Sequence, residues 1–499
     1  MTKKNSKHSF FFENDNFSCE SHLNGFTEEI YKEFDKKAKD LKLEQKINDL
    51  FEGKKVNKSE QRAATHVQLR NKITNGEKEI PFPVTKIRKD MAIVVVGIGG
   101  SYWGNEIINR YRLRNLKGHR YTYFVKNYSE LWDFLDSSKK TWLKTEKVNL
   151  PKVHFFFLSK SFTTVETINC LKSILPFSKE TNREYTITAI TANPKEAEKY
   201  GIDDIITIDE SIGGRYSIWS NMNIPSFIEV DPLPPTQEEL KKALTEALTQ
   251  KGNKFLNTPD EPRKYYPKEN PIEERYDSFK DFINGGYCSD VDLLNNKEYF
   301  EFVKRLAYSD IWMHNFENRN TRAILSYANF VSTLPYYLQQ LEMESLGKPA
   351  SSISEFKKTG QVILPGHGQN AQHSYLQLFH QGTHKLCADI ITSSTEDEYI
   401  DDDMMGIKPI SLLEAQAVTQ SKLFSYGALS YRSNDRPYMV LMVFMYSLRR
   451  LSLGAPMESP TTKAGASFEN TKTIYEMGPW TLRKTSTILD VPGVSILCA

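Results

Sequence analysis

The chain has 499 residues, and this length predicts roughly two to three domains rather than one core. Its formal net charge is +2, with 65 basic and 63 acidic residues interspersed, so the composition lacks the basic excess of nucleic-acid-binding proteins. No apolar run approaches the length that spans a bilayer, and the five cysteines are scattered without metal-ligand spacing. We therefore expect a soluble cytoplasmic protein without a nucleic-acid or membrane partner.

The first third of the chain changes from a helical pattern to a strand pattern. Residues 30–71 carry apolar side chains at helical spacing, as in "EEIYKEFDKKAKDLKLEQKINDLF". Short apolar runs then alternate with helical segments, beginning with "AIVVVGIGG" and ending with "DIITID". Runs that are apolar throughout are typical of strands covered on both faces, so we predict a parallel α/β sheet over residues 90–215.

The remainder of the chain divides into three stretches of different composition. Residues 230–298 are rich in Pro, Lys and Glu, and we predict a polar surface insertion there. Helical and strand patterns return from Tyr299 onward and indicate a second α/β unit. Residues 446–499 have weak periodicity, so we expect an irregular tail that buries few apolar side chains.

The stretch "VVVGIGGSYWG" joins a predicted strand to a predicted helix through several glycines. It does not fit the G-x-G-x-x-G dinucleotide fingerprint, because Tyr102 occupies the third glycine position. Two interpretations stay open: a tight turn, or a strand end where a ligand approaches backbone N–H groups beside the Ser101 hydroxyl.

The stretch "FFFLSKSFTTVET" places six Ser, Thr and Lys residues around one turn. Thr163 and Glu166 match a helix capping box, but capping does not explain the other hydroxyl groups of the turn. A helix N-terminus attracts anions, and hydroxyls add donors for phosphate oxygens. Because no GxxxxGK[ST] motif is present, we predict the phosphate of a small metabolite rather than that of a nucleotide.

Three further stretches carry polar residues whose roles the residues themselves leave open. "GGRYS" follows the last predicted strand, so Arg215 is expected at the edge of the sheet where ligands bind, with a surface ion pair as the alternative. "QQLEMES" offers Glu342 and Glu344, and no rule selects either as a base. In "GQNAQHSYLQLFHQGTH", His373 fits both a catalytic role and an ordinary place at the start of a helix. His380 and His384 have metal-ligand spacing, but the intervening Gly weakens the helix, so we predict no metal site.

These motifs, in this order, resemble those of the glucose-6-phosphate isomerase (phosphoglucose isomerase) family. The resemblance is carried by "GIGGS", "SKSFTTVET", "GGRYSIWS", "QQLEMESLGK" and "GQNAQHSYLQLFHQGT" and covers about residues 57–437. It implies an α/β fold with two three-layer sugar-isomerase (SIS) domains, each built on a parallel sheet. It also implies a glycolytic and gluconeogenic enzyme that interconverts glucose 6-phosphate and fructose 6-phosphate without a metal or organic cofactor. The family's active sites are shared across a homodimer.

The resemblance assigns roles to residues of this chain. Glu344 would be the base, Arg215 would stabilise the enediolate, and His373 of a partner subunit would assist opening of the sugar ring. The substrate-binding residues would be Gly100 and Ser101 on the sugar, Gln340 on the substrate, and Ser159, Lys160, Ser161, Thr164 and Thr167 on the phosphate. The resemblance thus favours Glu344 over Glu342.

The same resemblance divides the chain into five parts. They are a helical N-terminal segment over 1–74 that packs on the second domain, a first SIS domain over 75–229, the insertion over 230–298, a second SIS domain over 299–445 and a divergent tail over 446–499. The family's closing motif, Gln-x-Gly-Val-Glu-x-x-Lys, is absent, so we assign its lysine role to no residue and expect reduced activity. The alternatives are a non-catalytic SIS protein that senses sugar phosphates and an isomerase of another hexose phosphate.

Overall fold

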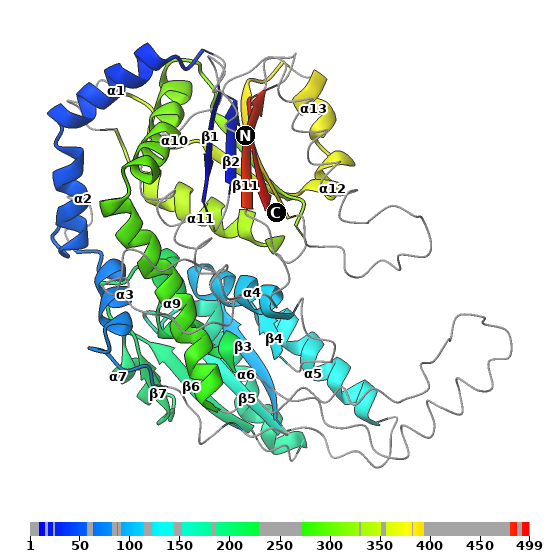
Figure 1. The fold of residues 1–499 in the computed structure, drawn as a ribbon. Helices are drawn as coiled ribbons and strands as arrows, with labels where there is room; N and C mark the ends of the chain where they lie inside the picture. Colours follow the sequence, from blue (N-terminus) through cyan, green and yellow to red (C-terminus); the bar gives the residue numbers. More distant parts are fainter. Residues whose placement is uncertain are drawn as a thin grey trace, which may run out of the picture.

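Two β-sheets organise the molecule in this computed structural model (Figure 1). The structure describes residues 9–14, 18–22, 25–56, 63–81, 87, 91–113, 122–143, 152–181, 185–228, 272–328, 331–350, 356–381, 383–393, 480–486 and 492–498. The mixed α/β fold with parallel strands that the sequence predicts is confirmed. Among the described helices, none is both long and apolar enough to cross a membrane.

The first sheet has five parallel strands in the order β4-β3-β5-β6-β7. Every residue of β3 is buried, which is the reason for its uninterrupted apolar sequence. The strands are β3 (Met91–Gly97), β4 (Thr122–Val125), β5 (Lys152–Leu158), β6 (Tyr185–Thr191) and β7 (Ile205–Thr207). The helical segments of this half are α4 (Gly100–Leu113), α5 (Tyr128–Leu143), α6 (Val165–Thr181), α7 (Pro194–Glu198) and the 3-10 helices η1 (Gly214–Trp219) and η2 (Asn221–Phe227).

The second sheet has seven strands in the order β1-β2-β11-β12-β10-β8-β9. Strands β8, β9, β10 and β12 run parallel, and β11 pairs antiparallel with β12. The strands are β1 (Ser9–Glu13), β2 (Ser18–His22), β8 (Thr321–Ser326), β9 (Val362–His367), β10 (Leu386–Ser393), β11 (Trp480–Ser486) and β12 (Pro492–Cys498). Its register places Ala388 opposite both Ala323 and Gly493.

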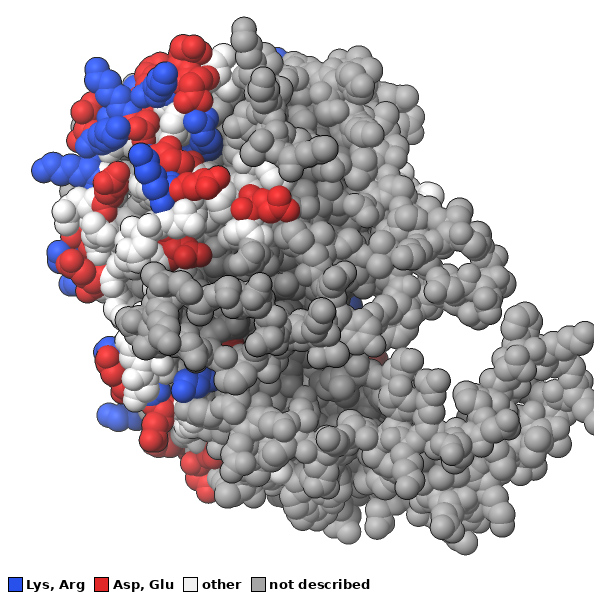
Figure 2. Space-filling view, viewed as in Figure 1, with Lys and Arg blue, Asp and Glu red and all other residues white. Residues whose placement is uncertain are grey.

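The remaining helices come from the N-terminal segment and from the second half of the chain. They are α1 (Glu28–Asp40), α2 (Leu43–Phe51), α3 (His66–Thr74), α9 (Ile272–Asn295), α10 (Lys297–Asn315), α11 (Leu334–Leu346), α12 (Gly368–Gln372) and α13 (Leu376–Gln381). In Figure 1, α1, α10, α11, α12 and α13 lie around the second sheet, whereas α3 and α9 lie beside the first sheet. Helix α1 packs on α10 through aromatic rings, with Phe34 and Tyr31 against Tyr308. Acidic and basic side chains are intermixed on the described part of the face in Figure 2, in keeping with the near-neutral net charge.

Two predictions about the ends of the chain need correction. The N-terminal segment contains the helices α1, α2 and α3, but it also contributes the strands β1 and β2. The tail is not irregular over Trp480–Ser486 and Pro492–Cys498, because β11 and β12 insert between β2 and β10. Strands β2, β11 and β12 pair with strands that are distant in the sequence, and a local pattern does not report such pairing. The burial of the tail's apolar side chains lies outside the described residues.

The predicted surface insertion over 230–298 is wrong for its last part, which forms α9. Phe279, Phe282 and Ile283 are fully buried, and their side chains pack against the first domain. The rings of Phe282 and Trp219 are stacked with their centroids 6.2 Å apart. The rings of Phe279 and Phe227 meet edge to face with their centroids 4.9 Å apart. Residues 229–271 lie outside the described residues, and the predicted domain boundaries stay a prediction.

Candidate active site

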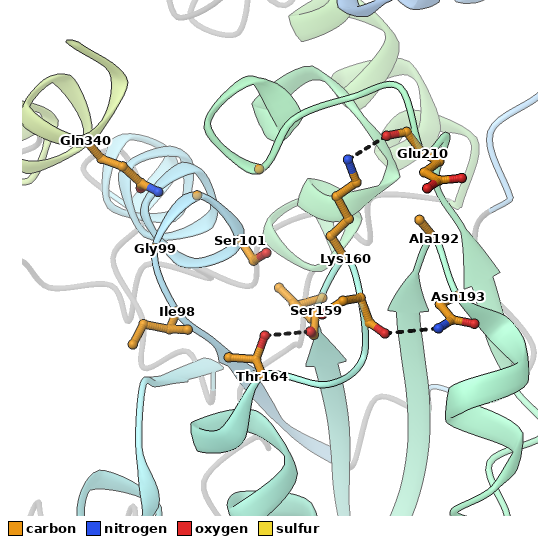
Figure 3. A pocket seen from close by; sticks show the side chains of 14 residues that line it. Ile98, Gly99, Ser101, Ser159, Lys160, Thr164, Ala192, Asn193, Glu210 and Gln340 are labelled. Atoms are coloured by element: carbon orange, nitrogen blue, oxygen red, sulfur yellow. Dashed lines mark hydrogen bonds between the residues drawn. The ribbon is translucent and has the colours of Figure 1, made fainter. Parts of the chain in front are cut away.

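A cavity of about 690 Å³ lies at the carboxyl ends of the strands of the first sheet (Figure 3). Its walls come from the segments that follow β3, β5, β6 and β7 and from one side chain of α11. Open parallel sheets bind ligands at this edge. The lining residues are Ile98, Gly99, Gly100, Ser101, Leu158, Ser159, Lys160, Ser161, Thr164, Ala192, Asn193, Glu210, Gly214 and Gln340.

The turn after β5, residues 159–164, directs hydroxyl groups toward this cavity. The Ser159 Oγ and Thr164 Oγ1 atoms lie 2.9 Å apart, and Phe162 N donates to Ser159 Oγ at 3.1 Å. Phe162 adopts a φ of 54°, a left-handed conformation that is uncommon for a bulky residue. This conformation buries the Phe162 ring in the core while Ser161 and Thr164 face the cavity. The backbone is thus bent sharply where the sequence predicts phosphate binding.

Lys160 and two residues that the sequence did not single out complete this end of the cavity. The Lys160 ammonium donates to the Glu210 carbonyl at 2.5 Å, and Asn193 Nδ2 donates to the Ser161 carbonyl at 3.3 Å (Figure 3). Asn193 and Glu210 follow β6 and β7, so strand order could have placed them at this edge. Neither stands beside the glycines or hydroxyl clusters that drew attention to the other loops.

Glycines allow α4 and η1 to approach closely on the opposite wall. Gly99 has a φ of 59°, and a Cβ there would lie 3.2 Å from Gln340 Nε2. A Cβ at Gly100 would lie 2.2 Å from the Gly214 carbonyl oxygen. Because this oxygen belongs to the backbone, no movement of a side chain could relieve the clash. The strand end "GIGG" is therefore both a turn and a point where backbone meets backbone.

The ion pair between Arg215 and Glu344 joins η1 to α11 next to the cavity. Arg215 Nη1 donates to Glu344 Oε1 at 2.9 Å, and Gln340 Nε2 donates to Glu344 Oε2 at 3.1 Å. Gln340 and Glu344 are four residues apart and share one face of α11. Arg215 is 5% exposed, whereas half of the Glu344 side chain is exposed. Arg215 and Glu344 adjoin the lining residues Gly214 and Gln340 without lining the cavity themselves.

Glu342 points away from this pair into the second domain. It is 3% exposed and accepts from Arg322 Nη2 at 2.6 Å. Burial lowers the pKa of Arg322, but the carboxylates of Asp389, Glu342 and Asp310 together hold that pKa above its usual value. Glu342 is therefore buried within the second domain, whereas Glu344 is half exposed and bonds Gln340, which lines the cavity.

Besides Arg215 and Glu344, two more of the predicted site residues do not line the cavity of this chain. Thr167 is buried in the first turn of α6, and its hydroxyl has no hydrogen-bond partner among the described residues. His373 ends α12 and is exposed. His384 is exposed as well, and the side chain of His380 lies outside the described residues.

These features define a two-domain α/β protein of the SIS type, with a hydroxyl-lined cavity at the carboxyl edge of its first sheet. The sequence profile of the family described as Phosphoglucose isomerase matches residues 20–79, 84–261 and 271–426. The chain belongs to this family.

Curated relatives and solved structures agree with this assignment. The glucose-6-phosphate isomerase of Buchnera aphidicola is 28% identical over 73% of this chain and 63% of its own length. That of Legionella pneumophila strain Paris is 28% identical over 72% of this chain and 68% of its own length. The chain therefore spans about two thirds of the length of these relatives. A glucose-6-phosphate isomerase structure from Chlamydia trachomatis shares the fold, with a TM-score of 0.56 at 18% identity over 83% of this chain and 79% of that one.

The close contact of α4 with η1 predicts opposite outcomes for two glycines that line the same cavity. Gly100→Ala should cost about 1–3 kcal/mol of stability, because the new methyl group must displace the backbone at Gly214. Gly214→Ala is the matched control, since a Cβ there meets nothing within 4 Å. Thermal unfolding of both variants measures the difference. Equal unfolding temperatures would contradict the contact between Gly100 and Gly214.

Proposed function

We propose that this chain interconverts glucose 6-phosphate and fructose 6-phosphate by aldose–ketose isomerisation through an enediolate. Its membership of the phosphoglucose isomerase family and the names of its relatives support this reaction. The observation that carries the proposal is the Arg215–Glu344 pair beside a hydroxyl-lined cavity. The pair supplies a carboxylate and a cation, and the cavity supplies a place for the sugar phosphate.

The phosphate would bind at the turn that follows β5. Ser159, Ser161 and Thr164 offer hydroxyl donors, Lys160 offers a positive charge, and the N-terminus of α6 favours an anion. We include Thr167 because its buried hydroxyl has no partner among the described residues, and a phosphate oxygen at the first turn of α6 would supply one. Gly100, Ser101 and Gln340 would contact the sugar farther along the cavity.

The reaction needs a base and a fixed positive charge. A C–H bond next to a carbonyl loses its proton to a carboxylate in reach, and the electron pair moves onto the carbonyl oxygen. We assign the base to Glu344, which would take the proton from one carbon and return it to the neighbouring one. Arg215 would stabilise the negative charge on the enediolate oxygen, where donors oriented in advance contribute most. Arg215 bonds one carboxylate oxygen of Glu344 and Gln340 bonds the other, while half of the Glu344 side chain stays exposed and open to a substrate.

We further propose a homodimer in which His373 of one subunit completes the site of the other and assists ring opening. The exposure of His373, and its position outside the cavity of its own chain, support this arrangement. We also propose a cytoplasmic location. The five cysteines are scattered without a CxxC pair or metal-ligand spacing, a usage that suits a reducing compartment.

Replacing the proposed base separates binding from chemistry. Glu344→Gln keeps the shape of the side chain and should lower kcat about a hundredfold to ten-thousandfold, because general-base catalysis contributes that much. The dissociation constant for fructose 6-phosphate, measured by calorimetry, should stay within about twofold, since the phosphate turn is on another segment. The matched control is Glu317→Gln, at a site remote from the cavity. If Glu344→Gln turns over at the normal rate, the assignment of the base is wrong. Binding of fructose 6-phosphate by the unaltered chain without turnover would instead favour a sugar-phosphate sensor.

The phosphate turn offers a matched pair of hydroxyl substitutions. Thr164→Val removes a hydroxyl that lines the cavity, so it should raise the dissociation constant for fructose 6-phosphate about tenfold, in proportion to one hydrogen bond to a charged group. Thr163→Val removes its neighbour, which bonds Ser161 at 2.8 Å and does not line the cavity, and it should change the affinity much less. Equal losses of affinity would mean that the turn acts through its fold rather than through contact with the ligand.

Shared active sites predict complementation between two inactive variants. Glu344→Gln and His373→Ala subunits, refolded together, should regain about a quarter of normal activity, because one site of each mixed dimer carries both groups and about half of a random mixture is mixed dimer. Native mass spectrometry would verify that mixed dimers are present. Mixed dimers without any recovery of activity would contradict the sharing of sites.

A further inference from the structure

Ser345 follows the proposed base on α11 and links two side chains of the other domain. Arg215 Nε donates to Ser345 Oγ at 2.7 Å, and the Tyr216 hydroxyl lies 3.0 Å from the same oxygen. Both contacts are buried. A serine hydroxyl can accept and donate together, so one small side chain bonds both partners.

Tyr216 is itself held from the other direction. Its ring stacks on that of His66 in α3, with centroids 4.7 Å apart and an interplanar angle of 8°. The Arg215 guanidinium lies over the same ring, 4.9 Å from its centroid. The tyrosine ring therefore separates α3 from the guanidinium and limits how far Arg215 can move.

The backbone of Arg215 is fixed by α11 as well. The Tyr337 hydroxyl donates to the Arg215 carbonyl at 2.8 Å. Burial raises the pKa of Tyr337 well above its usual value, so this hydroxyl stays protonated and continues to donate. Arg215 is thus held at its carbonyl by Tyr337, at Nε by Ser345 and across its face by Tyr216.

We propose that Ser345 and Tyr216 are positioning residues that orient the Arg215 guanidinium toward the enediolate. The inference rests on the isomerisation proposed above. An arginine side chain loses rotamer entropy when it is fixed. If Ser345 and Tyr216 fix the Arg215 side chain before substrate binds, no further rotamer entropy is lost when the transition state forms. A donor that is already oriented stabilises the transition state most. The pair acts through Arg215 and need not touch the substrate.

The test is a double-mutant cycle in the full chain. Ser345→Ala should lower kcat by about tenfold to a hundredfold, the range for residues that orient a catalytic group. Tyr216→Phe keeps the stacked ring and should give a smaller loss in the same direction. Neither should change the dissociation constant for fructose 6-phosphate more than about twofold. Ser309→Ala, which removes a buried helical serine far from the cavity, is the matched control and should leave kcat unchanged.

The decisive comparison repeats Ser345→Ala in the Arg215→Ala background. If Ser345 acts by orienting Arg215, its removal there should cause no further loss of kcat. An equal loss in both backgrounds would overturn the inference, because a structural role does not depend on Arg215. Should Ser345→Ala fail to fold by circular dichroism, Tyr216→Phe carries the same comparison.

A binding measurement keeps this inference distinct from the proposed function. A sugar-phosphate hydroxamate carries paired oxygens like those of an enediolate, and its affinity can be measured without turnover. Ser345→Ala should weaken its binding when Arg215 is present and leave it unchanged in Arg215→Ala. Weakening of equal size in both backgrounds would overturn the inference, whatever the activity. Absence of turnover in the unaltered chain would count against the proposed isomerisation alone.

Discussion

The ion pair between Arg215 and Glu344 joins the two halves of the molecule at the edge of the cavity. Burying a guanidinium costs several kcal/mol unless it is paired and hydrogen-bonded. Arg215 meets this condition where η1 and α11 come together, because Glu344, Ser345 and Tyr337 all belong to α11. The relative placement of the two halves and the geometry of the pair are therefore fixed by the same contacts.

Residues that are far apart in the sequence support the contact between η1 and α11. Arg70 of α3 makes a buried, two-pronged ion pair with Asp290 of α9, with N–O distances of 2.7 and 2.8 Å. The Arg70 guanidinium also lies over the Trp219 ring at the end of η1, 4.9 Å from its centroid. Helices α3 and α9 thus brace η1 from one side, while α4 approaches it through Gly100 on the other. These contacts hold η1 in place and so help to fix the shape of the cavity.

Local chemistry explains which parts of the fold and the site could be predicted. The apolar strands of the first sheet and the hydroxyls of the turn at residues 159–164 carry their signals within a few residues. The strands β2, β11 and β12 do not, because β2 pairs with β11 and β12 from the other end of the chain, and β12 pairs with β10 about a hundred residues earlier. Helix α9 was hidden by the proline-rich and charged composition before it, although Phe279, Phe282 and Ile283 have helical spacing.

The choice between two neighbouring carboxylates shows the same limit. Spacing along the chain did not separate Glu342 from Glu344, because side chains two positions apart on a helix face different ways and their surroundings come from elsewhere. Their partners distinguish them: Arg322 of β8 binds Glu342 within the second domain, whereas Arg215 of η1 binds Glu344. Ser345 and Tyr216 were missed for a related reason, since their hydroxyls gain meaning only when η1 and α11 meet.

We propose that this site moves a proton between neighbouring carbons of a sugar phosphate. Incubation of the purified chain with fructose 6-phosphate in D₂O, followed by NMR, tests it most directly. We expect glucose 6-phosphate that carries solvent deuterium at carbon 2, because a carboxylate base exposed to solvent exchanges its proton before returning it. Fructose 6-phosphate that stays unchanged, or glucose 6-phosphate free of solvent deuterium, would contradict this proton transfer.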